Sequence, residues 1–182
     1  MIREADMIVA TAQKLVEQTE NYVKKYSDEK KKVYYLPNAV DDELFDPRKN
    51  YEKPNDLILG EKNLLYYGSL WGEWFDWEII KNLAKDKTVS ITLIGDYSGI
   101  KNIVEEMPEN VHFLGLKKQT DLPSYLKYVD YAILPFKPGE ISDYVSPLKI
   151  FEYISMGKII LTTNLPDIQK YPNIYSSNNI NK

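Results

Sequence analysis

The chain has 182 residues, which is enough for one domain with a sizeable core or, barely, for two small ones. Its formal net charge of -4 argues against nucleic acid as the main partner, and the absence of cysteine excludes a disulfide framework, an iron–sulfur cluster and a thiol nucleophile. No apolar run approaches the roughly 18 residues that a membrane-spanning helix needs. This composition is compatible with the cytoplasm.

The first 40 residues predict a strand, a helix and a second strand. Residues 7–12 form a short apolar run, apolar side chains then recur at helical spacing to about residue 25, and residues 33–36 predict the second strand. The polar stretch of residues 48–56 predicts a linker. Lysines gather around the end of the helix, which fits peripheral membrane contact but more often marks a solvated surface: Lys24, Lys25, Lys30, Lys31 and Lys32.

From Leu57 onward strands and helices alternate, which is the signature of a parallel α/β sheet. The predicted strands are residues 63–67, 90–94, 111–114, 131–134 and 159–163. The predicted helices follow Asp76, cover residues 100–107 and 122–128, run from 147 to a stop at Gly157, and cover 167–171. Residues 176–182 predict a frayed end.

The carboxyl ends of parallel strands lie at one edge of the sheet, where ligands bind in folds of this kind. Four residues that directly follow predicted strands should therefore meet at that edge: Gly68, Gly95, Gly115 and Pro135. Glycines there let a ligand approach the backbone closely. We expect a ligand crevice along this edge.

The helix that should begin after the last of these strands carries the chemistry. Ser146 is predicted as its N-cap and Pro147 as its first residue, so its unpaired N–H groups suit a phosphate. Lys149 adds a full positive charge, and Glu152, three residues later, offers a carboxylate to a ribose diol. An exposed Lys149–Glu152 surface pair is the commoner outcome of this spacing.

This segment resembles the donor-binding motif of group-1 glycosyltransferases of the GT-B fold, in which a Glu is followed by seven residues and a second Glu. Glu152 matches the second Glu, whereas Tyr144 stands at the first, so Glu140 and Asp143 become candidates for holding the donor sugar. The sequence Ser-Pro-Leu-Lys-Ile-Phe-Glu-Tyr is similar to a branch of bacterial polysaccharide glycosyltransferases. Pro-Asn-Ala-Val-Asp, at residues 37–41, resembles the family's crossing between its two domains.

The resemblance implies a Rossmann-like parallel sheet with helices on both faces, the C-terminal half of a GT-B enzyme. Residues 1–40 would end the N-terminal domain, 41–56 would be a linker, and 57–182 would bind a nucleotide sugar. The implied reaction transfers a sugar from a nucleotide diphosphate sugar to a hydroxyl acceptor in cell-surface polysaccharide synthesis, in the cytoplasm or at the inner face of the membrane, without a metal or other cofactor. The acceptor half would be missing, so we expect donor binding without turnover.

The site residues implied by the resemblance lie in two loops and one helix. The diphosphate would be held by Gly68 and Ser69 together with Ser146, Pro147, Leu148 and Lys149, the ribose by Glu152, and the sugar by the loop from Glu140 to Tyr144. No catalytic residue is identified.

Some of the neighbouring aromatic and loop residues are expected to lie near the ligand, and others to pack in the core. Trp71 or Trp74 would lie near the donor, while Phe75 and Trp77 pack the loop. Leu116 and Lys117 would lie near the base through their backbone. The single histidine, His112, is expected to be structural, because no second His or Cys stands at metal-ligand spacing.

Two other functions stay open on these residues. A nucleotide-sugar epimerase or hydrolase can share the fold. A non-catalytic interaction module with a degenerate site is the second, because Ser69 replaces a usually basic residue and Tyr144 replaces an acidic one.

Overall fold

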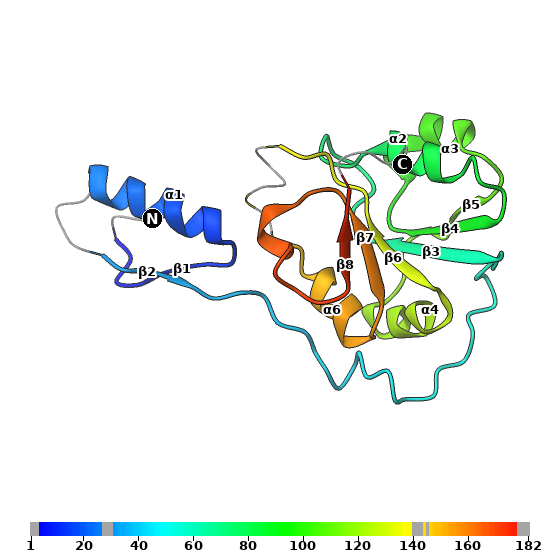
Figure 1. Cartoon of the computed structure of the whole chain (residues 1–182), viewed down its shortest axis with the longest axis horizontal. Helices are drawn as coiled ribbons and strands as arrows, with labels where there is room; N and C mark the ends of the chain where they lie inside the picture. Colours follow the sequence, from blue (N-terminus) through cyan, green and yellow to red (C-terminus); the bar gives the residue numbers. More distant parts are fainter. Residues whose placement is uncertain (1–3, 27–30, 140–143, 145, 178–182) are drawn as a thin grey trace.

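The computed structural model describes residues 4–26, 31–139, 144 and 146–177. In this part of the chain the strands form a two-stranded sheet and a six-stranded sheet with the order β5-β4-β3-β6-β7-β8 (Figure 1). All strand pairs in both sheets are parallel. Glu140 and Asp143, the two candidates for the donor sugar, lie outside the described residues, as does Lys30.

The two-stranded sheet is a strand–helix–strand unit, as predicted. It consists of β1 (Ile8–Ala10), α1 (Gln13–Tyr26) and β2 (Val33–Tyr35). Val16 and Val23 of α1 are buried, which is the helix-spaced apolar stripe that the sequence predicts.

The larger sheet carries helices on both faces, which confirms the predicted fold class. Figure 1 shows α2 and α3 on one face and α4 and α6 on the other. The strands are β3 (Lys62–Tyr67), β4 (Val89–Ile94), β5 (Val111–Phe113), β6 (Tyr131–Leu134), β7 (Ile159–Thr162) and β8 (Ile174–Ser176). The helices are α2 (Trp77–Leu83), α3 (Lys101–Glu106), α4 (Leu122–Tyr128) and α6 (Lys149–Ser155), with 3-10 turns η1 (Ser98–Ile100), η2 (Gln119–Asp121) and η3 (Pro166–Ile168).

The core lies along the central strands. All six residues of β4 are buried, as are five of the six in β3. Such near-continuous burial is expected for parallel strands covered on both faces. The predicted cap of α2 is confirmed, because the carboxylate of Asp76 accepts a hydrogen bond from the backbone N–H of Glu78 over 3.1 Å.

The end of the chain differs from the prediction. The helix expected over residues 167–171 is only the 3-10 turn η3, and it is followed by β8, which the sequence did not predict. β8 is three residues long, pairs with β7 and leaves Tyr175 exposed, so it carries almost no apolar pattern. Ser176, predicted to be frayed, belongs to this strand.

The segment between β2 and β3 contains no helix or strand, yet it packs closely on the larger sheet unit. Phe45 is fully buried, and its carbonyl oxygen accepts a hydrogen bond from the hydroxyl of Ser155 in α6. The phenol of Tyr128 in α4 donates to the carbonyl oxygen of Tyr51. Figure 1 shows the segment running past α6 and α4 to the start of β3.

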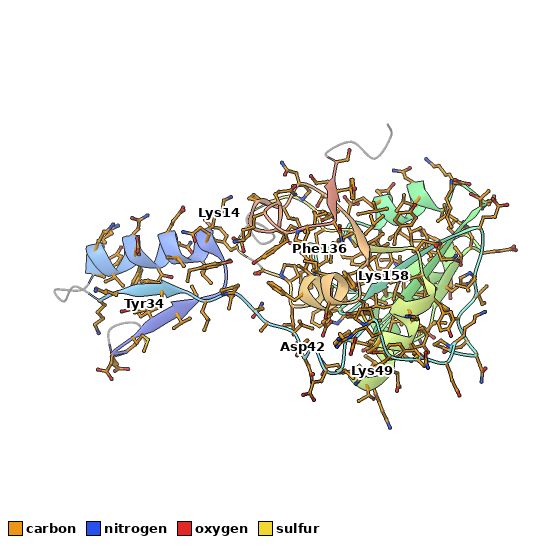
Figure 2. All side chains as sticks on the ribbon, turned by 60° about the horizontal axis from the view of Figure 1, so that its bottom comes forward. Lys14, Tyr34, Asp42, Lys49, Phe136 and Lys158 are labelled. Carbon is orange, nitrogen blue, oxygen red and sulfur yellow. The ribbon has the colours of Figure 1, made fainter. Side chains whose placement is uncertain are left out.

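The small unit contacts the larger one around η3. The backbone N–H of Gln13, at the start of α1, donates to the carboxylate of Asp167 over 3.1 Å. The ammonium of Lys170 donates to the phenol oxygen of Tyr35 over 2.7 Å. In Figure 2, Lys14 lies at the end of α1 nearest the larger unit. None of the helices in the described ranges is long and apolar enough to span a membrane.

Candidate functional site

The ends of three adjacent strands meet in backbone contact, as predicted from the sheet topology. The N–H of Gly68 donates to the carbonyl oxygen of Ile94, and the N–H of Gly95 donates to that of Gly115. A Cβ on Gly95 would lie 2.1 Å from the carbonyl oxygen of Gly68, so no side chain fits there. The carboxyl ends of β3, β4 and β5 therefore form a backbone-lined edge.

Helix α6 begins later than predicted, at Lys149. Ser146 is not its N-cap: Leu148 takes that position without a side-chain hydrogen bond, and the N–H of Ile150 bonds to the carbonyl oxygen of Pro147. Pro147 and Leu148 thus form a tight turn before the helix. The carbonyl oxygen of Ser146 accepts a hydrogen bond from the side-chain amide of Asn38 over 2.7 Å.

The predicted C-terminal stop of α6 is confirmed. Gly157 has a φ of 67° and its N–H donates to the carbonyl oxygen of Ile154, while the N–H of Lys158 donates to that of Tyr153. This pair of hydrogen bonds is the Schellman arrangement, which glycine favours because it has no Cβ. The hydroxyl of Ser146, before the helix, is buried and has no hydrogen-bond partner among the described residues.

The ammonium of Lys149 lies in an aromatic corner against the backbone of Gly68. Its Nζ is 5.1 Å from the ring centroid of Tyr66 and 5.6 Å from that of Phe136, which Figure 2 labels. A Cβ on Gly68 would lie 3.0 Å from both Cε and Nζ of this lysine. Burial lowers the pKa of Lys149 to about 8, although the nearby carboxylate of Glu152 acts to raise it.

Glu152 is buried, with 5% of its surface exposed. Its Oε2 accepts a hydrogen bond from the phenol of Tyr67 over 2.5 Å, and its Oε1 accepts one from the amide of Gln119 over 3.3 Å. The pattern-based alternative, an exposed Lys149–Glu152 surface pair, is therefore wrong. Both side chains turn inward because α6 packs against the end of β3.

In the part of the chain that the structure describes, the Lys149 ammonium has no hydrogen-bond or ion-pair partner. A largely buried cation usually has one, since an unpaired buried charge is unfavourable. The two rings stabilise it in part through the negative faces of their π systems. An anion placed beside Gly68 would complete its coordination.

In the loop after Gly68, the predicted packing of Phe75 and Trp77 is confirmed. Trp71 is 60% exposed, whereas Phe75 is buried against Tyr66, and its ring contacts that of Trp77 at a tilt of 42°. The hydroxyl of Ser69 donates to the carbonyl oxygen of Trp71, and the carbonyl oxygen of Ser69 accepts from Tyr66. The loop is thus held by its own hydrogen bonds.

Among the described residues, none of the remaining candidates is hydrogen-bonded to Lys149 or Glu152. Leu116 is 76% exposed beyond β5, while Lys117 is paired with Asp56 over 2.6 Å. His112 lies in β5, where burial lowers its pKa. Tyr144 is half-buried, with the ammonium of Lys14 5.9 Å from its ring centroid.

Four side chains that shape this region were not predicted from the sequence: Tyr66, Tyr67, Gln119 and Phe136. The three aromatic residues have the pattern of core residues, and Tyr66, Tyr67 and Phe136 are indeed buried. A phenol just before a strand-ending glycine was the available signal for Tyr67. Nothing local distinguishes Gln119 from a surface glutamine.

Comparison with known proteins places the chain in a family. The family model described as "Glycosyl transferases group 1" matches residues 61–174. The chain is also 29% identical over 184 residues to TuaH of Bacillus subtilis (strain 168), whose provisional name is teichuronic acid biosynthesis glycosyltransferase. That alignment covers 96% of this chain and 44% of TuaH, so the chain spans less than half the length of this relative.

Solved structures show the same fold. Sucrose-phosphate synthase from Thermosynechococcus elongatus matches with a TM-score of 0.67 and 16% identity, over 99% of this chain and 47% of the enzyme. A glycosyltransferase from Rickettsia africae gives 0.66 and 17%, over 96% and 50%. Anabaena HepE in complex with UDP-glucose gives 0.56 and 17%, over 88% and 45%.

The chain belongs to the group 1 glycosyltransferases, and its larger sheet has the fold of one Rossmann-like half of a GT-B enzyme.

Proposed function

We propose that this chain binds the nucleotide diphosphate sugar donor of a hexosyltransferase that extends a cell-surface polysaccharide. The observation that carries the proposal is the Lys149 ammonium, which is largely buried, lies against the backbone of Gly68 and has no hydrogen-bond or salt-bridge partner among the described residues. A diphosphate would supply a direct anionic partner. Ligand binding at the carboxyl edge of a parallel sheet is the general rule for such folds.

The diphosphate would lie between the two loops that meet at this edge. Gly68 and Ser69 would contribute backbone groups, Ser146 its unpartnered hydroxyl, and the turn at Pro147 and Leu148 its peptide groups. During transfer, negative charge builds up on the leaving diphosphate. A fixed ammonium at that place stabilises the charge without reorganisation, which is how preorganised electrostatic groups accelerate reactions.

The rest of the donor would extend to both sides of the diphosphate. Glu152, which acts electrostatically on Lys149, would accept hydrogen bonds from the ribose. The sugar would contact the segment that ends at Tyr144, and Leu116 would border the base. Anabaena HepE, a fold neighbour, was solved with UDP-glucose, so uridine nucleotides come first in any panel.

The acceptor site would belong to a second half. The matched relative and structures are about twice as long as this chain. We propose that residues 1–40 end that half, that 41–56 connect the two halves and that 57–182 bind the donor. The chain alone would bind donor without transferring sugar, and the assembled enzyme would work on the cytoplasmic side of the membrane, where nucleotide sugars and lipid-linked acceptors meet.

A thermal-shift titration tests this proposal directly. The chain is melted with UDP-, GDP- and ADP-sugars, alongside Glu152→Ala and the matched surface control Glu106→Ala, whose carboxylate pairs with Lys81. A ligand at 100 times its dissociation constant stabilises the fold by about 2.7 kcal/mol, which raises the melting temperature by roughly 5 to 10 °C in a chain of this size. We expect one nucleotide sugar to stabilise the wild type and the control, with loss of this effect in Glu152→Ala.

The other outcomes separate the alternatives. A flat response over the whole panel contradicts donor binding and supports an interaction module. Release of free sugar or of a new sugar isomer without acceptor supports a hydrolase or an epimerase. Transfer to an added acceptor by this chain alone contradicts the expected need for a second half.

A further inference from the structure

The carboxylate of Glu152 is held from two sides by neutral donors. Tyr67, the last residue of β3, donates its phenol O–H to Oε2 over 2.5 Å. Gln119, the first residue of η2, donates its amide to Oε1 over 3.3 Å. The two donors come from different elements, so the carboxylate is fixed between the end of β3 and the connection that follows β5.

This arrangement leaves half of the carboxylate's hydrogen-bonding capacity unused. An ionised carboxylate has about four lone-pair sites that accept hydrogen bonds. Two are used by Tyr67 and Gln119, and each donor takes a different oxygen. Each oxygen of the Glu152 carboxylate therefore keeps one free acceptor site. The two hydroxyls of a vicinal diol can each donate to a different oxygen.

The phenol of Tyr67 stays protonated and therefore remains a hydrogen-bond donor to Glu152. Burial raises the pKa of its phenol, and so does the negative charge of Glu152, so the O–H persists at all ordinary pH values. Its ring packs edge-to-face on Tyr153, with centroids 5.0 Å apart, and its backbone N–H donates to the phenol oxygen of Tyr153. These contacts restrict the ring, and the ring in turn restricts Glu152.

Gln119 differs from Tyr67 because it lies on the surface. It follows Leu116 by three residues, in the connection proposed to border the base. Its amide therefore links the position of that connection to the orientation of Glu152, which lies in α6.

We infer that Tyr67 and Gln119 are positioning residues, which hold Glu152 so that both of its oxygens accept hydrogen bonds from the two ribose hydroxyls of the nucleotide. The inference rests on the proposed function and adds to it a specificity: the site selects ribonucleotides over 2′-deoxyribonucleotides. Neither side chain needs to touch the ligand. Fixing a binding group through its own hydrogen-bond partners is the usual way in which such precision is reached.

Calorimetric titrations with paired ligands test the inference. UDP and 2′-deoxy-UDP, and the corresponding guanosine and adenosine pairs, are titrated into the wild type, Tyr67→Phe, Gln119→Leu and Glu152→Ala. Tyr128→Phe is the matched control, because it removes a phenol hydrogen bond of 2.6 Å to the carbonyl oxygen of Tyr51, outside the site. Melting temperatures without ligand verify that each variant folds.

We expect the wild type to favour the ribonucleotide on the order of tenfold or more, and Tyr67→Phe to remove most of this preference by weakening ribonucleotide binding alone. Gln119→Leu should reduce the preference less, because the hydrogen bond from Gln119 to Glu152 is longer than that from Tyr67. This second variant also tests the inference if Tyr67→Phe does not fold. Tyr128→Phe should keep the wild-type ratio.

Two results would overturn the inference for different reasons. An unchanged ribose preference in Tyr67→Phe and Gln119→Leu, with loss of preference in Glu152→Ala, would leave the proposed function standing and assign both donors to structure only. Absence of binding by all six nucleotides to the wild type would overturn the proposed function and the inference with it.

Discussion

Replacing Lys149 by methionine should stabilise the free protein and remove most of its nucleotide affinity. Burial lowers the pKa of this ammonium from 10.5 to about 8. At about 1.4 kcal/mol per pH unit, the charged form is disfavoured by about 3 kcal/mol at neutral pH. Methionine has a similar length and no charge, so the substitution removes this penalty while it keeps most of the packing.

The loss of two cation–π contacts offsets part of that gain. Both rings lie within 6 Å of Nζ, and such contacts contribute about 0.5 to 1 kcal/mol each. The net gain is therefore about 1 to 2 kcal/mol, which should raise the melting temperature by roughly 2 to 8 °C. Affinity for the nucleotide diphosphate should fall roughly 10- to 150-fold, because hydrogen bonds to charged groups contribute about 1.5 to 3 kcal/mol.

Urea unfolding and calorimetric titration with UDP measure the two effects separately. Lys158→Met is the matched control: burial also lowers the pKa of Lys158, but its ammonium donates to the carbonyl oxygens of Val129 and Lys127. Its removal should lower stability and leave affinity unchanged. A Lys149→Met protein that is less stable than the wild type and binds UDP equally well would refute the reasoning.

Three further predictions concern Lys149, Gly95 and Asp167. Nucleotide affinity should fall as the pH rises from 8 towards 10.5, because the folded protein loses the proton of Lys149 over this range, and calorimetry in two buffers should record proton uptake on binding. In the free protein, the contribution of Lys149 to the free energy of unfolding should rise over the same range. The reason is that the unfolded chain still holds the proton that the folded chain has released. Gly95→Ala should lower the free energy of unfolding by about 3 kcal/mol or more, because its Cβ would meet the carbonyl oxygen of Gly68, and a melting temperature near that of the wild type would contradict this close packing. Asp167→Ala should destabilise α1 by about 1 kcal/mol by removing the acceptor of the Gln13 N–H, which hydrogen exchange should detect as faster exchange in α1 with β3 unchanged.

Most of the fold could be predicted because its signals are local. Strand–helix alternation from Leu57, the cap at Asp76 and the stop at Gly157 each depend on a few neighbouring residues, and the structure has them where expected. The failures lie where the local signal is weak or misleading. The strand β8 has only three residues, too few to show an alternating apolar pattern. Ser146 is a residue type that favours N-caps, but Leu148 takes that position in the structure, and the carbonyl oxygen of Ser146 accepts a hydrogen bond from Asn38.

The candidate site was predictable only in part. Sequence resemblance singled out Lys149 and Glu152, but their spacing on one helix also fits an ordinary surface ion pair. What excludes that pair is the packing of α6 against the end of β3, a strand some 80 positions earlier. The fold also brings Tyr67 and Gln119 into hydrogen-bond contact with Glu152, which no sequence motif indicates.

The sequence by itself determined the order of strands and helices as far as β7, the parallel α/β class and the sheet edge at which the strand-ending glycines meet. Periodicity, capping residues and glycines act over a few residues, so they can be read along the chain. Tertiary structure alone decided that Lys149 lies against two rings without a salt-bridge partner among the described residues and that Glu152 is held by two donors. These environments depend on strand order and on how α6 packs on β3, because the contacting residues are far apart along the chain. They leave the ammonium of Lys149 and one acceptor site on each oxygen of Glu152 open to a ligand.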